Sequence, residues 1–179
     1  MAAPPETTLL IGLGSHLRPA LHLPQAIRLL RQTFVGVRLS TFYRTRPIGD
    51  PSQSPYVNGV TIAVTPLSLA ATRAALRAIE AQCGRVRAPD PRHAAPTLDL
   101  DLLAFGDTAL PEEQLPAPDL LERDFCLLPA AELRPEWVHP GVGQTLRQLA
   151  AERFPRPTHI LGPVAVATAR RLAEACGAV

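Results

Sequence analysis

A short stretch of alternating leucine and aspartate constrains the fold more than any other part of this sequence. Residues 98–103 run Leu-Asp-Leu-Asp-Leu-Leu, so apolar and acidic side chains alternate with a period of two. That period is typical of a β-strand, in which successive side chains point to opposite faces of the sheet. The leucines would then face a core, while Asp99 and Asp101 share the other face with their Cα atoms roughly 7 Å apart. The chain is therefore expected to contain a sheet whose one face is polar at this strand.

Hydrophobic periodicity divides the rest of the chain into strands and helices. Apolar and β-branched runs predict four strands: Thr7–Gly14, Val35–Thr45, Tyr56–Thr65 and Leu98–Phe105. Helical spacing predicts helices over roughly Leu21–Phe34, from the N-cap Ser68 to the stop at Gly84, over Glu122–Leu133 and over Gln144–Arg153. Two proline-containing segments are predicted to be loops: Arg46–Pro55 and Arg85–Thr97.

The order of these elements predicts the fold class. The order β, α, β, β, α, β matches an α+β, ferredoxin-like split βαβ layer with helices on one face and long ligand-binding loops. We expect residues 7–153 to form this domain. Residues 154–179 are expected to form a Pro-broken linker and an Ala-rich C-terminal appendage.

Composition excludes several classes of function. The 179 residues are 46% hydrophobic and 19% charged, which is enough apolar material for a sizeable core in one domain. The net charge of +2 is too small to indicate a nucleic-acid or membrane partner. All 18 basic residues are arginine, which excludes a phosphate-loop lysine, a Schiff-base lysine and a lysine general base.

Cysteine spacing and the N-terminus bear on the cellular compartment. Cys83, Cys126 and Cys176 are far apart and lack the spacing of a disulfide pair or a zinc site. No basic segment precedes an apolar run at the N-terminus, and no stretch approaches the ~18 apolar residues of a membrane span. We therefore expect a cytoplasmic protein, and a monomer.

Acidic and basic pairs indicate a site for phosphate and metal. Two carboxylates at the spacing of Asp99 and Asp101 repel each other unless a cation lies between them, and Mg²⁺ prefers oxygen ligands. Arg85 and Arg87 follow a helix stop and suit a loop over a polyphosphate, since guanidinium groups bind phosphate oxygens in bidentate fashion. The alternatives are an acidic strand face in solvent and a solvated basic loop.

An aromatic ring and an amide indicate a site for a planar heterocycle. Tyr56 and Asn58 lie on the same side of their predicted strand. A ring offers a stacking face, and an amide presents a donor and an acceptor to the edge of a heterocycle. Phe125 could supply a second stacking face. The alternatives are a surface tyrosine beside a turn-forming asparagine, and a core phenylalanine.

Together these residues resemble the 6-hydroxymethyl-7,8-dihydropterin pyrophosphokinases of folate biosynthesis. The likeness extends from about Leu9 to Arg153 through the segments IGLGS, STFYRTRPIG, PYVN, IEAQCGRVR, TLDLDLLAFGD, LLERDFCLLPAAEL and VHP. The run Thr97–Asp107 is very specific, and the order and spacing of the other segments strengthen the likeness.

The resemblance implies transfer of diphosphate from the co-substrate ATP to the hydroxymethyl oxygen of the pterin, with release of AMP. It implies that Asp99 and Asp101 hold two Mg²⁺ ions and act in catalysis with Arg85, Arg87 and Arg92. It assigns nucleotide contacts to Glu80, Arg85, Arg87, Leu102 and Arg123. It assigns contacts with the pterin to Thr45, Ile48, Tyr56, Asn58 and Phe125.

Three positions depart from the family pattern. Pro96 stands where the family has a loop arginine before Thr97, and Arg92 substitutes for that arginine only if the loop slips by one residue. Ala117 stands where the family has a histidine that contacts nucleotide, and His16 replaces an asparagine near the N-terminus. The first two departures remove an arginine and a histidine that the family places near the nucleotide.

Three hypotheses remain open from the sequence. The first is an active pyrophosphokinase with a modified phosphate loop, which the retained Asp99 and Asp101 favour. The second is a divergent family member that binds pterin or nucleotide but has lost or changed the reaction, which the missing loop groups favour. The third is a ferredoxin-like RNA-binding module, and the lack of an aromatic strand motif or a basic stripe argues against it.

Overall fold

One antiparallel sheet organises the residues that the computed structural model describes, which are 6–48, 53–85 and 97–164. Within these residues the strands run in the order β5-β1-β4-β3-β6, and β2 also pairs with β4. Their bounds are β1 (Thr7–Ser15), β2 (Val35–Leu39), β3 (Tyr43–Thr45), β4 (Tyr56–Thr65), β5 (Asp99–Phe105) and β6 (Ile160–Pro163). The predicted α+β class and the split βαβ order are confirmed.

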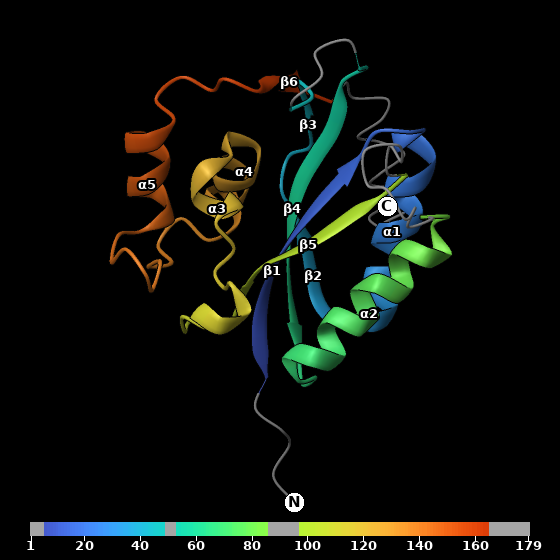
Figure 1. Ribbon diagram of the computed structural model, residues 1–179, viewed down its shortest axis with the longest axis horizontal. Coiled ribbons are helices and arrows are strands. Elements are labelled where there is room, and N and C mark those ends of the chain that lie inside the picture. The colour runs from blue at the N-terminus through green and yellow to red at the C-terminus, as the bar shows by residue number, and fades with distance from the viewer. Residues whose placement is uncertain (1–5, 49–52, 86–96, 165–179) are drawn as a thin grey trace, which may run out of the picture.

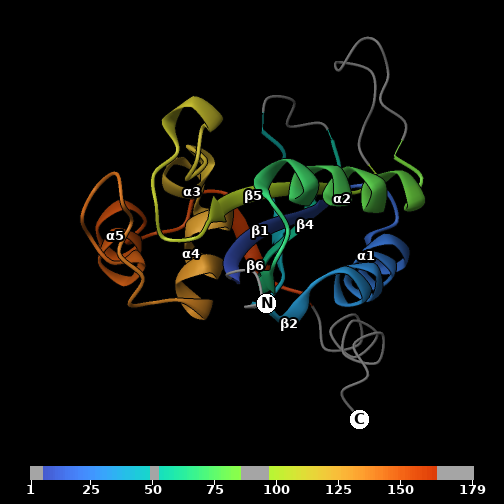
Figure 2. The ribbon, with the colours of Figure 1, turned by 90° about the horizontal axis from the view of Figure 1, so that it is seen from below.

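Helices lie on both faces of this sheet (Figure 1). Helices α1 (Pro19–Thr33) and α2 (Leu69–Gln82) cover one face, and α4 (Asp124–Leu133) packs against β4 from the other face. Helices α3 (Asp119–Glu122) and α5 (Leu146–Arg153) contact α4 on that second face, and Figure 2 shows the same arrangement from below. The expectation of helices on a single face therefore holds for α1 and α2 and is wrong for α4. None of the described helices has both the length and the apolar character needed to cross a bilayer.

Strand β1 contributes to two cores because its apolar residues point both ways. Leu9, Ile11 and Leu13 pack with α1 and α2, whereas Leu10 packs with Leu103 and α4 on the opposite face. A strand buried on both faces needs a continuous apolar run rather than strict alternation. This requirement explains the run of leucine and isoleucine in the first half of β1.

Helix α2 begins and ends as the sequence predicts. The Ser68 side chain accepts a hydrogen bond from the Ala71 amide at 3.3 Å, and Gly84 follows the helix with φ +81°. Leu76 and Ile79 bury the inner face of the helix against the sheet. The end of α2 is thereby fixed beside β5.

The single strand predicted over Val35–Thr45 is divided by a break after Leu39. The Ser40 amide donates to the Val60 carbonyl and the Ser40 hydroxyl accepts from the Val60 amide, both at 2.9 Å. The pairing with β4 resumes one residue out of register, with Tyr43 opposite Asn58. Because a serine hydroxyl replaces a carbonyl of the ladder, the chain shifts register here without leaving a buried amide unpaired.

The C-terminal region also differs from the prediction. Residues 160–163 were expected to belong to a linker, but they form β6, which pairs with β3. The predicted helix over Glu122–Leu133 begins at Asp124, because Arg123 is extended between α3 and α4. The Ala-rich segment from residue 165 onward lies outside the described residues, and the predicted domain boundary at residue 153 stays a prediction.

Candidate functional site

Two glycines of β1 place the acidic and amide side chains on one face of the sheet. Gly14 pairs with Asp99 of β5 on one side and with Asn58 of β4 on the other, and Gly12 pairs with Asp101. A Cβ atom added to Gly14 would lie 2.7 Å from Oδ1 of Asn58. Because the middle strand carries no side chain here, the space between β5 and β4 stays open.

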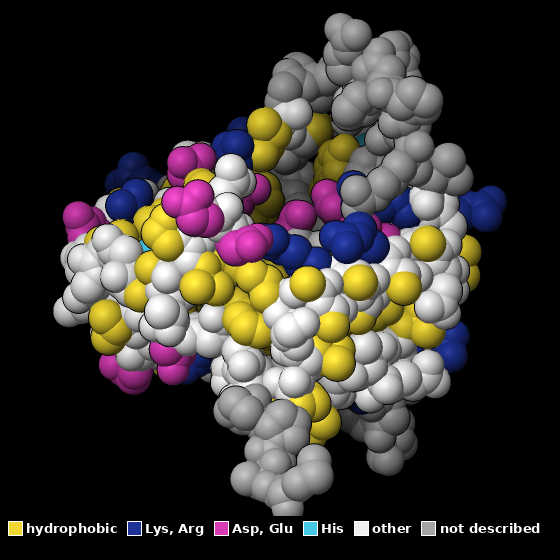
Figure 3. Space-filling view, turned by 60° about the horizontal axis from the view of Figure 1, so that its bottom comes forward, with side chains coloured by type: hydrophobic (Ala, Val, Ile, Leu, Met, Phe, Trp, Pro, Cys, Tyr) yellow, Lys and Arg dark blue, Asp and Glu magenta, His cyan; other side chains and the backbone are white. Residues whose placement is uncertain are grey.

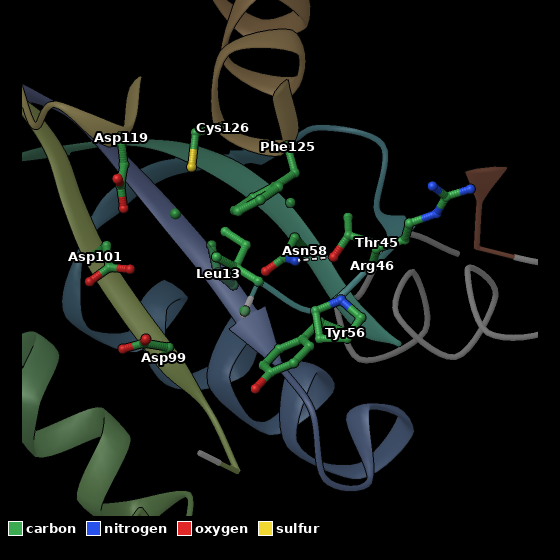
Figure 4. A pocket seen from close by; sticks show the side chains of 15 residues that line it. Leu13, Thr45, Arg46, Tyr56, Asn58, Asp99, Asp101, Asp119, Phe125 and Cys126 are labelled. Carbon is green, nitrogen blue, oxygen red and sulfur yellow. Dashed lines mark hydrogen bonds between the residues drawn. The ribbon is translucent and has the colours of Figure 1, made fainter. Parts of the chain in front are cut away.

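This open space is a cavity of about 270 Å³ (Figure 4). The tyrosine and the asparagine come from β4, the threonine from β3, and the phenylalanine from α4. The cavity thus brings together all five residues that the family resemblance assigned to the pterin: Thr45, Ile48, Tyr56, Asn58 and Phe125. The carboxylates of Asp99 and Asp101 lie at the other end of the cavity (Figure 4).

Neighbouring side chains fix the polar and aromatic groups of this cavity. The amide nitrogen of Asn58 donates to the buried hydroxyl of Thr45 at 2.6 Å, so the amide oxygen is directed into the cavity (Figure 4). The Tyr56 ring packs against the His16 ring, with 4.4 Å between the centroids and a tilt of 32°. Burial, followed by the negative charge of Asp99, raises the pKa of the Tyr56 hydroxyl. The phenol therefore remains neutral at physiological pH.

A second cavity, of about 630 Å³, lies on the other side of the two aspartates. Arginines of α2 line one wall, namely Arg73 and Arg77, and the segment after β5 lines the opposite wall. Asp99, Asp101 and Asp119 border both cavities. Figure 3 shows acidic side chains in a hollow of the surface with arginine side chains next to them. The aspartates therefore stand where the two cavities meet.

Glu80 connects α2 to the aspartate strand. Its side chain is only 4% exposed, and its Oε1 accepts from the Leu100 amide at 2.9 Å and pairs with Nη1 of Arg85. The same Nη1 pairs with Oδ1 of Asp99 and donates to the Leu98 carbonyl at 3.3 Å. Glu80 is therefore buried against β5 and does not lie on a solvated helix face.

The network around Arg85 also determines its charge. Partial burial lowers the pKa of the Arg85 guanidinium, but the hydrogen bond and the charges of Asp99 and Glu80 outweigh this effect, so the pKa is raised. Arg85 thus carries a fixed positive charge at the wall of the second cavity.

The remaining predicted nucleotide residues are distributed unevenly. Leu102 and Ala117 line the second cavity. Arg123 lines neither cavity and lies with its Nε 3.5 Å from the Asp119 carboxylate. Arg87 and Arg92 lie outside the described residues, so their predicted roles stay predictions.

Sequence reasoning missed three charged residues of the site. Two of them, Arg73 and Arg77, lie four residues apart in α2. They share one helix face with Glu80, which the sequence had already singled out. That spacing was available in the sequence as a signal. The third is Asp119, the first residue of the short helix α3, and nothing in the local sequence indicates that it borders both cavities.

The electrostatics at the junction favour a cation. Loss of hydration, followed by the negative charges of Asp99, Asp119 and Glu80, raises the pKa of Asp101 to about 7. In the described part of the chain, no set of three His, Cys, Asp or Glu side chains is placed to hold a metal ion by itself. An ion held by Asp99 and Asp101 would therefore complete its coordination with water or ligand oxygens, which is the common arrangement for Mg²⁺.

Comparison with known proteins identifies the family of the chain. Residues 10–135 match the family model described as 7,8-dihydro-6-hydroxymethylpterin-pyrophosphokinase (HPPK). The chain belongs to the HPPK family. An enzyme of Synechocystis named 2-amino-4-hydroxy-6-hydroxymethyldihydropteridine pyrophosphokinase is 38% identical over 146 residues, which cover 78% of this chain and 72% of that protein. The protein of the same name from Haemophilus influenzae is 36% identical over 155 residues, which cover 82% of this chain and 96% of that protein.

Solved structures agree on the fold. Wild-type HPPK-DHPS of Plasmodium falciparum with STZ-DHP superposes with a TM-score of 0.69 at 13% identity. The match covers 85% of this chain and 44% of that chain, so this chain spans less than half of the solved protein. At this low identity the likeness shows that this chain has the HPPK fold, and it carries no residue roles.

The raised pKa of Asp101 makes the stability of the metal-free protein depend on pH. The folded-state pKa of about 7 exceeds the ordinary aspartate value of 3.8, so the folded state binds the proton more tightly than the unfolded state does. The free energy of unfolding should therefore fall as the pH rises from about 4 to about 7. We expect Asp101→Asn to be more stable than the wild type at about pH 8 by about 1 kcal/mol. The difference is this small because Asp101 is exposed, so water screens its charge.

Urea denaturation with EDTA between about pH 4 and pH 8 measures this difference. Most of the stabilisation should be lost near pH 4, because the folded wild type is then protonated and the unfolded state is partly protonated. The exposed carboxylate of Glu112 supplies a matched control, since Glu112→Gln should leave the pH profile unchanged. An Asp101→Asn protein that is less stable than the wild type at pH 8 would contradict the assignment.

Proposed function

We propose that this HPPK family member transfers diphosphate from ATP to the hydroxymethyl group of 6-hydroxymethyl-7,8-dihydropterin, with release of AMP. The names of the relatives and the matched family model support this reaction. The proposal rests above all on the position of Asp99 and Asp101, which border both cavities. The first cavity is lined by aromatic rings and the Asn58 amide, and the second is lined by arginines. A transferase that joins two different substrates needs two sites that meet at the reacting atoms.

The pterin is assigned to the first cavity. Tyr56 and Phe125 supply aromatic faces for the ring system, and the oxygen of Asn58 accepts from an N–H at its edge. Thr45 holds the Asn58 amide in one orientation, so the acceptor is preorganised. The hydroxymethyl group would then point toward the aspartates at the end of the cavity.

ATP is assigned to the second cavity. Arg85 uses Nη1 for its contacts with Glu80, Asp99 and Leu98, and its other nitrogens can donate to phosphate oxygens. Arg77 and Arg73 extend the positive wall along α2, although Arg73 is already paired with Glu113. Leu76 and Leu102 supply apolar surface in the same cavity.

We assign two Mg²⁺ ions to Asp99 and Asp101, whose carboxylates would hold them where the two cavities meet. Such ions would lower the raised pKa of Asp101 and would offset the repulsion between the two carboxylates. When bound, Mg²⁺ neutralises phosphate charge and stabilises the charge that develops during transfer.

The reaction needs no covalent intermediate with the protein. The hydroxymethyl oxygen attacks the β-phosphorus in line, the bond between that phosphorus and the α-phosphate oxygen breaks, the hydroxyl proton is lost, and AMP leaves. The protein residues orient both substrates and supply positive charge from Arg85, and positioning of this kind accounts for a large part of such catalysis.

Ala117 bears on the alternative of a member that has lost the reaction. It lines the second cavity without a polar group, as its position in the sequence led us to expect. The guanidinium of Arg77 lines the same cavity from α2 and forms no ion pair with a described residue. A positive group is therefore present in the cavity despite the missing histidine, which favours the active enzyme.

Replacement of the aspartates tests the proposed reaction. We expect Asp99→Asn and Asp101→Asn to lower AMP formation from ATP and hydroxymethyldihydropterin by at least ~10²-fold, because each removes an anionic ligand of an ion that faces the phosphates. Excess EDTA should abolish AMP formation by the wild type, and added Mg²⁺ should restore it. Asp107→Asn is the control, because Asp107 accepts from the Trp137 indole and lines neither cavity. Near-normal turnover in both aspartate variants would rule out this site.

Arg77 allows a separate test of the nucleotide cavity. We expect Arg77→Ala to raise the KM for ATP by roughly 10-fold, as is usual for loss of one charge-assisted hydrogen bond, and to leave the KM for the pterin unchanged. Arg147→Ala is the matched control, since Arg147 pairs with Glu136 and its side chain is 67% exposed outside both cavities. Steady-state kinetics that give equal KM values for ATP in the two variants would contradict the assignment of ATP to this cavity.

A further inference from the structure

A buried carboxylate with no role in the mechanism above lies directly behind the first cavity. Asp124 is the first residue of α4 and its side chain is fully buried. Its Oδ2 accepts from the backbone amides of Thr158 and His159 at 2.7 Å each, and from that of Ile160 at 3.3 Å. A buried carboxylate is stable only when such donors replace its hydration. Asp124 therefore binds a segment more than thirty residues away in the sequence.

The second oxygen of Asp124 fixes one wall of the cavity. Oδ1 accepts from the Phe125 amide at 2.9 Å and lies 3.2 Å from Nδ1 of His159. The His159 ring meets the Phe125 ring edge to face, with 5.9 Å between centroids and 85° between planes. The ring of Phe125 is thus held by a residue of the bound segment, and it lines the cavity (Figure 4).

A second wall of the cavity depends on the same segment. The His159 carbonyl accepts from the Arg46 amide at 2.8 Å, and Ile160 pairs with Thr45 as β6 joins β3. Thr45 in turn holds the amide of Asn58. One carboxylate is therefore connected through segment 158–160 to the phenylalanine wall and to the threonine and asparagine wall.

We propose that Asp124 and segment 158–160 form an anchor that sets the separation between Phe125 and Asn58, so that Asp124 is a positioning residue for the pterin. The inference rests on the function proposed above. None of the anchor residues lines the second cavity. Loss of the anchor should therefore weaken the pterin site and leave the ATP site intact, whereas a residue that acts only on stability would lower the active fraction without changing either KM.

Asp124→Asn is the principal test, because the amide keeps the shape of the side chain but turns an NH₂ group or a weaker acceptor toward three N–H donors. With the full chain, and with the folded fraction set by urea denaturation, we expect the KM and the calorimetric Kd for hydroxymethyldihydropterin to rise at least ~10-fold, as is typical when a buried charge-assisted network is lost. The KM for ATP and kcat should stay within about twofold. Asp107→Asn is the stability control, since it removes a carboxylate bonded to Trp137 but should leave the Kd for the pterin unchanged.

A second pair of variants covers the possibility that Asp124→Asn fails to fold. His159→Ala removes the ring behind Phe125 but keeps all three backbone bonds, and we expect a rise of about threefold in the Kd for the pterin with no change for ATP. His159→Phe restores an aromatic ring in contact with Phe125 and should recover most of the affinity.

The outcomes separate this inference from the proposed function. If the wild type binds the pterin and the Asp124 and His159 variants bind it equally well, the anchor is overturned while the function stands. If the variants lose affinity for ATP and for the pterin in equal proportion, Asp124 does not act on the pterin cavity in particular and the inference fails. A wild-type chain without affinity for the pterin would overturn the proposed function and the anchor together.

Discussion

The central strand β1 must fill two cores at one end and leave a cavity at the other, and the whole site depends on how it does so. Leu10 points into the core under α4, whereas Gly12 and Gly14, on the same face, carry no side chain. A Cβ at Gly14 would collide with Asn58, so the acidic strand and the amide strand can face one cavity only because glycine lies between them. The same strand therefore provides the stability of the sheet and the room for a ligand.

Strand β5 is aligned with this cavity by two further features. Its register with β1 shifts between Leu10 and Ile11, so that Leu103 and Ala104 both reach the second core while Asp99 and Asp101 face the cavity. At the other end of β5, the buried Glu80 accepts a hydrogen bond from the Leu100 amide and pairs with Arg85, which contacts Asp99. Helix α2, the strand and the arginine are thus fixed relative to one another before any substrate binds, which lowers the entropic cost of binding.

Local periodicity was sufficient to predict the elements that depend on their own sequence. The bounds of β4 and the cap and stop of α2 were predicted correctly, because β-branched alternation, a serine N-cap and a glycine stop act over a few residues. The pairing of Asp99 and Asp101 on one face followed for the same reason. The gathering of Tyr56 and Asn58 with Phe125 came from the family resemblance, since nothing in the spacing of these residues shows that α4 lies beside β4.

Features that depend on distant contacts were missed. The break at Ser40 depends on the Val60 amide, and β6 forms because Asp124 binds the backbone of residues 158–160. A proline-containing segment without apolar alternation gives no local sign of a strand, so Ile160–Pro163 was assigned to a linker. The arginines of α2 were missed although their helical spacing was visible, because only the tertiary structure shows which face of α2 borders the aspartates.

The central claim is that Asp99 and Asp101 hold a cation at the meeting point of the two substrate cavities. Proton relaxation of hydroxymethyldihydropterin in the presence of Mn²⁺ and a non-hydrolysable ATP analogue tests it most directly, because a paramagnetic ion broadens only the signals of nearby protons. The account predicts strong broadening of the hydroxymethyl protons in the wild type, and none in a variant that carries both Asp99→Asn and Asp101→Asn yet still binds the pterin. Sharp hydroxymethyl signals in a wild-type complex that contains both ligands and Mn²⁺ would contradict it.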